Sequence, residues 1–155
     1  MKKLCNNIIL FFKSLFSNSL ISKADIIYEE SPEWLPIETI IILKINEYRY
    51  EEGVTPLTRH HYLKNETNIR VKYLVATNKL SHDKFFESSK RLKKKGFTSI
   101  SENLAFGYKS ASDIVEAWKK SPSHNKAMLK NYSDAAVSHL KGNNGYFTCL
   151  IFAKS

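Results

Sequence analysis

Residues 101–124, with the sequence SENLAFGYKSASDIVEAWKKSPSH, concentrate the side chains of this protein that can carry chemistry. Glu102 lies at the start of the stretch and His124 at its end, and a second histidine, His82, lies upstream. Two imidazoles and a carboxylate that arrive from three separate segments can converge on one pocket, which neighbours on a single helix cannot do. The rest of the chain is therefore expected to be a scaffold that brings these side chains together.

Composition places the chain among globular proteins with a single domain. Its 155 residues suffice to bury one core without disulfides or a metal, and 43% are hydrophobic and 25% charged. The formal net charge is +9; four lysines precede Asp25, the first acidic residue, so a product that begins there carries +5. Such a surface favours encounters with anionic membranes, glycans or acidic proteins. No nucleic-acid-binding motif accompanies the charge, and nucleic acid is not an expected partner.

Residues 1–24 have the pattern of an export signal, and the protein is expected at the cell surface or outside the cell. Two lysines lead the segment, residues 8–16 are largely apolar, and residues 22–24 suit a cleavage site. Lys13 interrupts the apolar run, so two alternatives stay open: an arm on a cytoplasmic protein, or an uncleaved leader that retains the protein at the membrane. Residues 25–35 are expected to form an irregular lead-in, and residues 36–155 the domain.

Cysteine content predicts a fold without disulfides. Cleavage after Ala24 leaves Cys149 alone, so the hydrophobic core has to hold the fold. Cys149 lies in an apolar, strand-like run, where a buried packing role is expected.

The first half of the domain has the apolar spacing of helices. One helix is predicted from Pro36 to Gly53, because proline suits a first turn and glycine suits a C-cap. Thr58 is expected to cap a second helix that continues to the Ser81–His82 pair. The apolar face of this second helix is expected to comprise Ile69, Tyr73, Ala76 and Leu80.

The second half changes from helices to strands. A helical piece is expected over residues 83–96, and another helix between the cap candidates at 110–113 and Pro122. Residues 135–141 and 146–153 flank Gly-Asn-Asn-Gly, which predicts an antiparallel hairpin. Both alternating faces of the last strand are apolar, which is typical of a sheet covered by helices on both sides.

Five ordered motifs together resemble the CAP superfamily. This superfamily comprises the cysteine-rich secretory proteins, antigen 5 and pathogenesis-related 1 proteins, and its domain is also called the SCP domain. The spacing is similar to that of the short, cysteine-poor bacterial branch, and the resemblance extends from about residue 36 to the C-terminus. The motifs are Asn46-Glu47-Tyr48-Arg49, Gly53 with Pro56-Leu57, Ser81-His82, Glu102-Asn103-Leu104-Ala105-Phe106-Gly107, and Trp118-Lys119-Lys120-Ser121-Pro122-Ser123-His124.

The resemblance implies an α+β fold, namely an α-β-α sandwich in which helices cover both faces of a small antiparallel sheet. It also implies a cleft with two histidines and two acids, which holds a divalent cation in some members. By position, the cleft residues are His82, Glu102, Ser121 and His124, and Ser121 stands where many members have the second acid. The candidate ligands of zinc or magnesium are therefore His82, Glu102 and His124, an incomplete tetrad.

Each of these residues also has a purely structural interpretation. Glu102 could accept hydrogen bonds from backbone N–H groups and one histidine, and His82 and His124 could form an ordinary buried polar pair. Trp118 is expected in the core, and Asn103 is expected to anchor a turn.

Two functions of different classes follow from the resemblance. The first is a non-enzymatic binding module for a lipid, a sterol or a host macromolecule, because no Ser-His-Asp motif, nucleophile elbow or His-Glu-x-x-His is present and no catalytic residue can be assigned. The alternative is a divalent-metal-assisted hydrolase, a protease or esterase, that uses the same cleft. A cytoplasmic structural protein would follow only if the leader is not functional. A monomer is expected, with peripheral membrane association as a further possibility.

Overall fold

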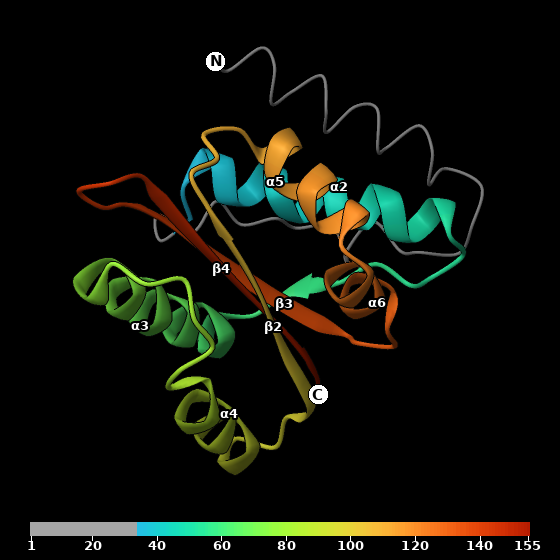
Figure 1. The fold of residues 1–155 in the computed structure, drawn as a ribbon. Helices are drawn as coiled ribbons and strands as arrows, with labels where there is room; N and C mark the ends of the chain where they lie inside the picture. The colour runs from blue at the N-terminus through green and yellow to red at the C-terminus, as the bar shows by residue number, and fades with distance from the viewer. Residues whose placement is uncertain (1–33) are drawn as a thin grey trace. The chain divides into compact units, whose positions relative to one another are not determined.

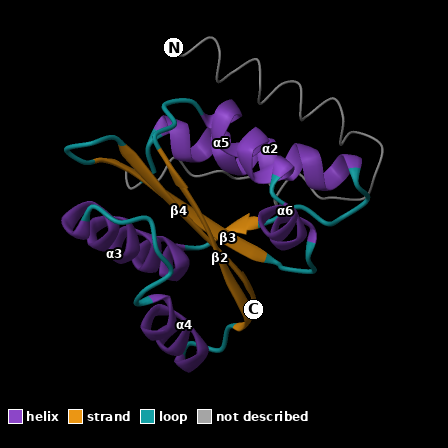
Figure 2. Cartoon of the chain, in the orientation of Figure 1, coloured by secondary structure: helices purple, strands orange, loops and turns teal. Residues whose placement is uncertain are grey.

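The computed structural model describes residues 34–155, which form five helices and four strands (Figures 1 and 2). The predicted export signal at 1–24 and nearly all of the lead-in at 25–35 lie outside the described residues, so both stay predictions. In chain order the elements are α2 (Pro36–Glu51), β1 (Thr58–Arg59), α3 (His61–Thr77), α4 (Phe85–Lys94), β2 (Thr98–Phe106), α5 (Ala111–Lys120), α6 (Pro122–Leu129), β3 (Asp134–Lys141) and β4 (Tyr146–Lys154).

The four strands form one sheet in the order β1-β3-β4-β2. β3 and β4 are the predicted antiparallel hairpin, with Lys141 opposite Tyr146 next to the turn. β2 runs antiparallel along the other side of β4 and places Glu102 opposite Ile151. β2 is thus one edge of the sheet, and loops from either helical layer can meet there.

β1 corrects the prediction that Thr58 caps a helix. Thr58 instead pairs in parallel with Asp134 of β3, and its N–H donates to the Ser133 carbonyl at 2.8 Å. The cap of α3 is His60, whose Nδ1 accepts the Tyr62 N–H at 3.2 Å. The neighbouring strand offers Thr58 backbone hydrogen bonds that sequence spacing does not reveal. The sheet is therefore antiparallel except at this two-residue edge.

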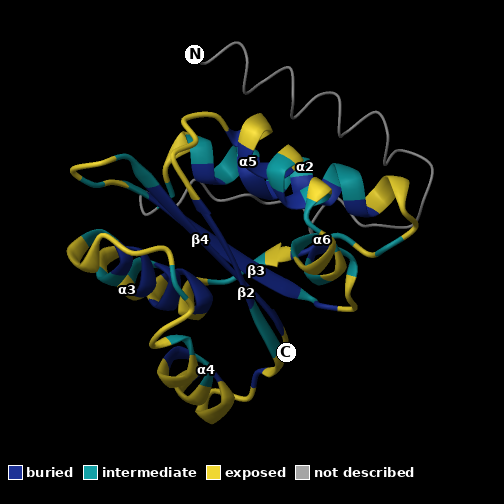
Figure 3. Ribbon diagram, in the orientation of Figure 1, coloured by how far each residue is buried: buried dark blue, intermediate teal, exposed yellow. Residues whose placement is uncertain are grey.

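Helices cover both faces of the sheet, as expected for an α-β-α sandwich. α2, α5 and α6 pack on one face, and α3 and α4 on the other (Figure 1). β4 contributes Leu150 and Phe152 to the first apolar cluster and Cys149 and Ile151 to the second, because successive side chains of a strand point to opposite faces. Figure 3 shows the central strands buried between the layers.

Several helix boundaries agree with the capping signals. Pro36 is the first residue of α2, and Gly53 follows its end with φ +71°, a conformation that glycine adopts cheaply. Ser110 caps α5, since its Oγ accepts the Asp113 N–H at 3.1 Å. Pro122 both follows α5 and starts α6.

The inward face of α3 differs from the predicted one. α3 ends at Thr77, before the predicted end at Ser81–His82. Ile69 is 51% exposed and Leu80, beyond the end of the helix, is 49% exposed, so the predicted apolar face was wrong at these two residues, whereas Tyr73 packs partly buried against the apolar cluster. The face that packs on the sheet is polar as well as apolar. Its buried residues are Leu63, Lys64, Glu66, Thr67, Arg70, Val71 and Leu74.

Carboxylates on the facing elements explain how lysine and arginine can be buried on α3. Lys64 Nζ lies 2.7 Å from Glu38 Oε2, and each side chain is 2% exposed. Glu38 Oε2 also accepts the Leu35 N–H at 2.9 Å, and Oε1 accepts the His139 N–H at 2.9 Å. One carboxylate therefore joins the start of α2 to α3 and β3, which satisfies the condition that buried charges be paired.

His139 is a buried histidine of β3 and belongs to none of the motifs quoted above. Its ring stacks on Tyr146 with centroids 4.8 Å apart, and its Nδ1 lies 2.9 Å from Thr148 Oγ1. Burial lowers the pKa of His139, because the imidazolium loses solvation by water.

We predict that this histidine makes stability depend on pH. The native state prefers the neutral ring, so the unfolded chain takes up the proton first as the pH falls below about 6.5. The free energy of unfolding should then fall with pH, by at most about 1.4 kcal/mol per unit for one group. Urea unfolding at about pH 7.5 and about pH 5.5 measures this loss. The loss should be smaller in His139→Gln; an equal loss would assign the pH dependence to other groups.

Candidate functional site

Glu102 is the buried centre of the candidate site. It lies on β2, and its side chain points to the face that carries α3 and α4, where it is fully buried. The Sγ of Cys149, on the neighbouring strand β4, donates to Glu102 Oε2 at 3.3 Å. Burial, followed by the charge of Glu102, raises the pKa of the Cys149 thiol well above its usual value. Cys149 is thus the buried packing cysteine that was predicted, and it is the free cysteine of residues 34–155.

Arg70 of α3 holds the Glu102 carboxylate with two hydrogen bonds. Its Nε donates to Oε2 at 2.6 Å and its Nη2 to Oε1 at 3.0 Å, and the arginine side chain is 1% exposed. Burial by itself lowers the pKa of Arg70, but the hydrogen bonds and charge of Glu102 outweigh it and the net shift is upward. The two groups therefore form a buried, bidentate ion pair.

Arg70 also positions the loop between α3 and α4. Its guanidinium donates to the carbonyl of Ser81 at 2.9 Å and to the carbonyl of Asp83. These bonds flank His82 on both sides, so the arginine that anchors Glu102 also fixes the backbone that carries His82.

Sequence reasoning missed Arg70, although a signal for it existed. Leu63, Thr67, Arg70 and Leu74 fall four, three and four residues apart, which is the spacing of one helix face. A search for apolar residues alone passes over a face that contains an arginine.

His82 lies at the exposed rim of the site. Its Nδ1 is 2.8 Å from Glu102 Oε1, while its side chain is 59% exposed. A carboxylate that is paired with a guanidinium can only accept, so Nδ1 carries the hydrogen and Nε2 of the neutral ring is left as an acceptor. The structure thus brings together two of the predicted residues, His82 and Glu102.

His124 approaches the same edge of the sheet from the opposite helical layer. It lies in the first turn of α6, and Asn103 of β2 donates from Nδ2 to its carbonyl oxygen at 3.1 Å. Burial and, second, the charge of His82 lower the pKa of His124. Asn103 was expected to anchor a turn; it is a buried residue of β2, and its side chain ties that strand to the first turn of α6. We call His82 and His124 the histidine rim.

Ser121 supplies no acid to the site. It precedes α6, and its Oγ lies 3.5 Å from Ser123 Oγ. The nearest acid in sequence, Glu116, pairs with Lys119 at 3.2 Å on α5. Trp118 is in the core as predicted, 1% exposed, and its Nε1 donates to the Leu104 carbonyl at 2.8 Å.

These residues do not fit a resident divalent cation. Within residues 34–155, no three histidine, cysteine, aspartate or glutamate side chains gather in a metal-binding arrangement. Both oxygens of Glu102 already accept from the Arg70 guanidinium, a fixed cation that would repel a dication at close range. Metal binding by His82, Glu102 and His124 thus stays a prediction that this geometry does not favour.

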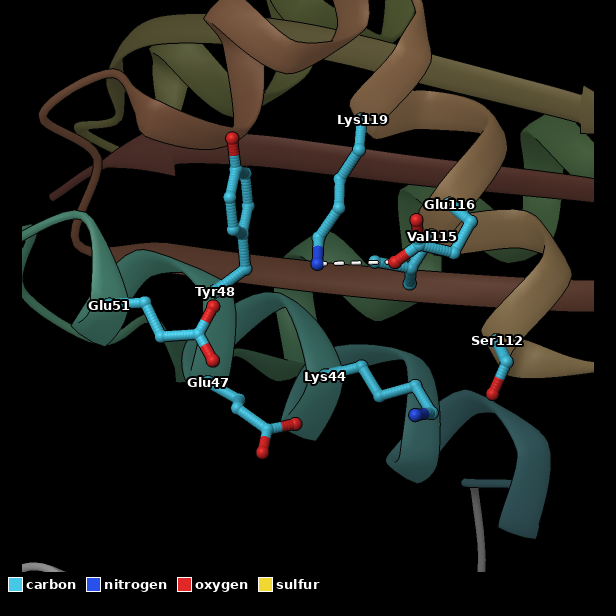
Figure 4. Close-up of a pocket in the computed structure, with 8 residues that line it drawn as sticks. All are labelled: Lys44, Glu47, Tyr48, Glu51, Ser112, Val115, Glu116 and Lys119. Carbon is cyan, nitrogen blue, oxygen red and sulfur yellow. Dashed lines mark ion pairs between the residues drawn. The ribbon is translucent and has the colours of Figure 1, made fainter.

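A shallow groove lies in the other helical layer, between α2 and α5 (Figure 4). It holds about 60 Å³, far less than the several hundred Å³ of small-molecule pockets. Lys119 reaches across it over the Tyr48 ring, 4.4 Å from the centroid. The groove does not include the histidine rim and has no room for a lipid or sterol. Its lining residues are Lys44, Glu47, Tyr48, Glu51, Ser112, Val115, Glu116 and Lys119.

Comparison with known families agrees with this fold and these motifs. The model of the cysteine-rich secretory protein family, CAP, matches residues 43–152. This chain belongs to the CAP family. Proteins of this family are of an extracellular type, and the resemblance noted in the motifs is confirmed.

Solved CAP structures share the fold at low sequence identity. An outer surface protein from Borrelia burgdorferi is 22% identical, with a TM-score of 0.68 over 75% of this chain and 90% of that one. A cysteine-rich secretory protein from Staphylococcus aureus is 18% identical, with a TM-score of 0.64 over 83% of this chain and 41% of that one. An extracellular SCP-domain protein from Bacillus anthracis is 18% identical, with a TM-score of 0.65 over 76% of this chain and 40% of that one.

The last two relatives are more than twice as long as the part that this chain matches. No curated protein matches the chain significantly in sequence. None of the helices in residues 34–155 is long and apolar enough to cross a membrane.

We predict that Arg70→Ala destabilises this CAP domain strongly. The change leaves the Glu102 carboxylate buried without its guanidinium, and removing one partner of a buried pair costs roughly 3–5 kcal/mol. Urea unfolding followed by far-UV circular dichroism measures the loss. Lys84→Ala is the control, because Lys84 pairs with Glu87 at 3.3 Å while the two side chains are 61% and 47% exposed, and water screens such an exposed pair so that it adds little to stability. Similar losses in the two variants would show that the buried pair does not anchor the fold.

Proposed function

We propose that this CAP-domain protein is an exported binding module, which recognises an extracellular macromolecule at the histidine rim and does not hydrolyse it. Family membership and the relatives from the outer surface of Borrelia and from outside Bacillus cells support the location. The pattern of residues 1–24 supports export independently.

The Arg70–Glu102 ion pair carries the non-enzymatic part of the proposal. A hydrolase that uses a metal-bound water needs ligands free to coordinate the metal, and the one carboxylate of this site is engaged by a guanidinium. A hydrolase that uses a nucleophile needs a hydroxyl or thiol within hydrogen-bond reach of a base. In residues 34–155, no hydroxyl or thiol is hydrogen-bonded to the ring of His82 or His124.

Exposure of the rim favours a macromolecular ligand over a buried small one. His82 presents more than half of its side chain to solvent while Glu102 and Arg70 fix its ring and its backbone. A rigid, exposed imidazole with its partners beneath it suits surface recognition, because little side-chain freedom is lost on binding.

One contact favours the alternative, a hydrolase. The Glu102 contact to His82 Nδ1 leaves Nε2 as a possible general base or metal ligand. The tests below therefore measure catalysis together with binding.

Replacing both histidines of the rim should abolish binding of the macromolecular partner. It should change no hydrolytic activity, because none is expected. The immobilised native protein should capture a specific partner from extracellular host or neighbour-cell material, and His82→Ala/His124→Ala should not. His61→Ala is the control, since His61 is exposed on α3 and matches no motif of the family.

Ester and peptide hydrolysis and calorimetry with Zn²⁺ and Mg²⁺ complete the experiment. We expect that the native protein and the double variant show neither hydrolysis nor cation binding at the histidine rim. Turnover or cation binding that the double variant loses would establish the hydrolase instead. Absence of any captured partner would contradict the binding proposal.

Export has its own measurement. Mass spectrometry of the protein from its native host should find a mature N-terminus at Asp25, after cleavage at Ala24. An intact leader on protein in the cytoplasm would contradict export, and an intact leader on membrane-bound protein would indicate retention.

A further inference from the structure

The outward face of α4 combines lysines with an exposed aromatic ring. Phe86, Lys90 and Lys93 lie four and three residues apart, so they share one side of the helix, and Lys94 is adjacent. All four residues are exposed, and Phe86 is 75% exposed. We call these four residues the α4 basic face.

The opposite side of α4 accounts for its packing. Ser88 and Leu92 are its buried residues, and Phe85 packs against the apolar cluster of that layer. α4 packs on α3 and β2 and lies at the outside of its layer (Figure 1), with yellow, exposed residues along its free side (Figure 3). Phe86 is therefore not needed to hold α4 in place.

No carboxylate neutralises the α4 basic face. Lys90, Lys93 and Lys94 form no ion pair with any residue in the described range 34–155. The acids near the helix have other partners: Glu87 pairs with Lys84 at 3.3 Å, and Glu66 pairs with Arg91.

The preference of cations for the C-terminal end of a helix explains only part of the α4 basic face. Cations in the last turn suit the helix dipole, which accounts for Lys93 and Lys94. The dipole does not account for a phenylalanine three-quarters exposed in the first turn, on the same side as the lysines. Basic residues that surround an exposed aromatic ring are typical of helices that lie on membranes.

We propose that the α4 basic face docks on an anionic phospholipid bilayer. Lys90, Lys93 and Lys94 contact the lipid headgroups, and Phe86 enters the boundary between headgroups and acyl chains. An acidic glycan would complement the charges but would leave the ring in water, so charge and exposure together favour lipid. The proposal rests on residues outside the histidine rim and is independent of the function proposed for it.

Sedimentation with vesicles tests this proposal on the full protein as exported. The protein should bind vesicles of phosphatidylcholine mixed with phosphatidylglycerol and not vesicles of phosphatidylcholine alone, and added salt should weaken the binding. Lys90→Gln/Lys93→Gln/Lys94→Gln should lower the partition coefficient about a hundredfold, since each lysine near an anionic surface contributes about fivefold. The matched control is Lys109→Gln/Lys120→Gln/Lys126→Gln, which removes the same charge from exposed lysines elsewhere. The partition coefficient of this control variant should stay within about fivefold of that of the native protein.

The aromatic ring has separate tests. Phe86→Ser should weaken vesicle binding while leaving its salt dependence, and a tryptophan in Phe86→Trp should shift its fluorescence to the blue on anionic vesicles. Circular dichroism verifies that each variant is folded, and the Phe86→Trp signal does not depend on the lysine variants. Equal losses in the two triple variants, no binding to anionic vesicles, or an unshifted tryptophan would each overturn the proposal. Binding to soluble heparin in place of vesicles, unaffected by Phe86→Ser, would overturn it in favour of a glycan.

Discussion

Arg70 and Glu102 form an ion pair with almost no access to solvent, and the position of the histidine rim depends on it. Burying two charges is costly unless their remaining donors and acceptors are satisfied. Here the guanidinium bonds the carboxylate twice and also two carbonyls of the loop before α4, while the carboxylate accepts from His82 and Cys149 as well. These hydrogen bonds offset the free-energy cost of burying the pair, and they also join α3, β2, β4 and the loop before α4.

A second buried pair, Lys64 with Glu38, extends this principle along α3. The helix packs on the sheet with two cations, and each meets one acid from another element. The layer of α2, α5 and α6 is held differently, mainly by aliphatic and aromatic side chains. With a free, buried Cys149 and no disulfide within residues 34–155, apolar packing, hydrogen bonds and ion pairs hold the domain together.

The guanidinium of Arg70 also bears on the chemistry of the site. The CAP resemblance led us to expect an acid that helps to hold a dication, but here a protein side chain supplies the positive charge beside Glu102. The result is an exposed imidazole, that of His82, above a buried ion pair. The loop that carries His82 leads directly into α4, so the two proposed binding surfaces are consecutive in the chain while resting on different residues.

The sequence by itself determined the family, the hairpin and most helix boundaries. Local signals were sufficient for these: Pro36 and Ser110 begin helices, Gly53 follows the end of one, and the turn at 142–145 lies between two apolar strands. The ordered motifs also singled out His82, Glu102 and His124 as candidate site residues, and the structure joins the first two by a hydrogen bond. Caps, turns and motifs each depend on a few consecutive residues, so they can be recognised in the sequence without knowledge of the fold.

Only the tertiary structure decided what was buried on α3 and how Glu102 is used. Arginine and lysine normally face solvent, so periodicity favoured Ile69 and Leu80 for the core, and both are half exposed. Whether a charge can be buried depends on a partner that is distant in sequence, as Glu102 is from Arg70. Thr58 likewise joined a strand because β3 lay beside it. Such pairings arise between elements, and no local pattern in the chain contains them.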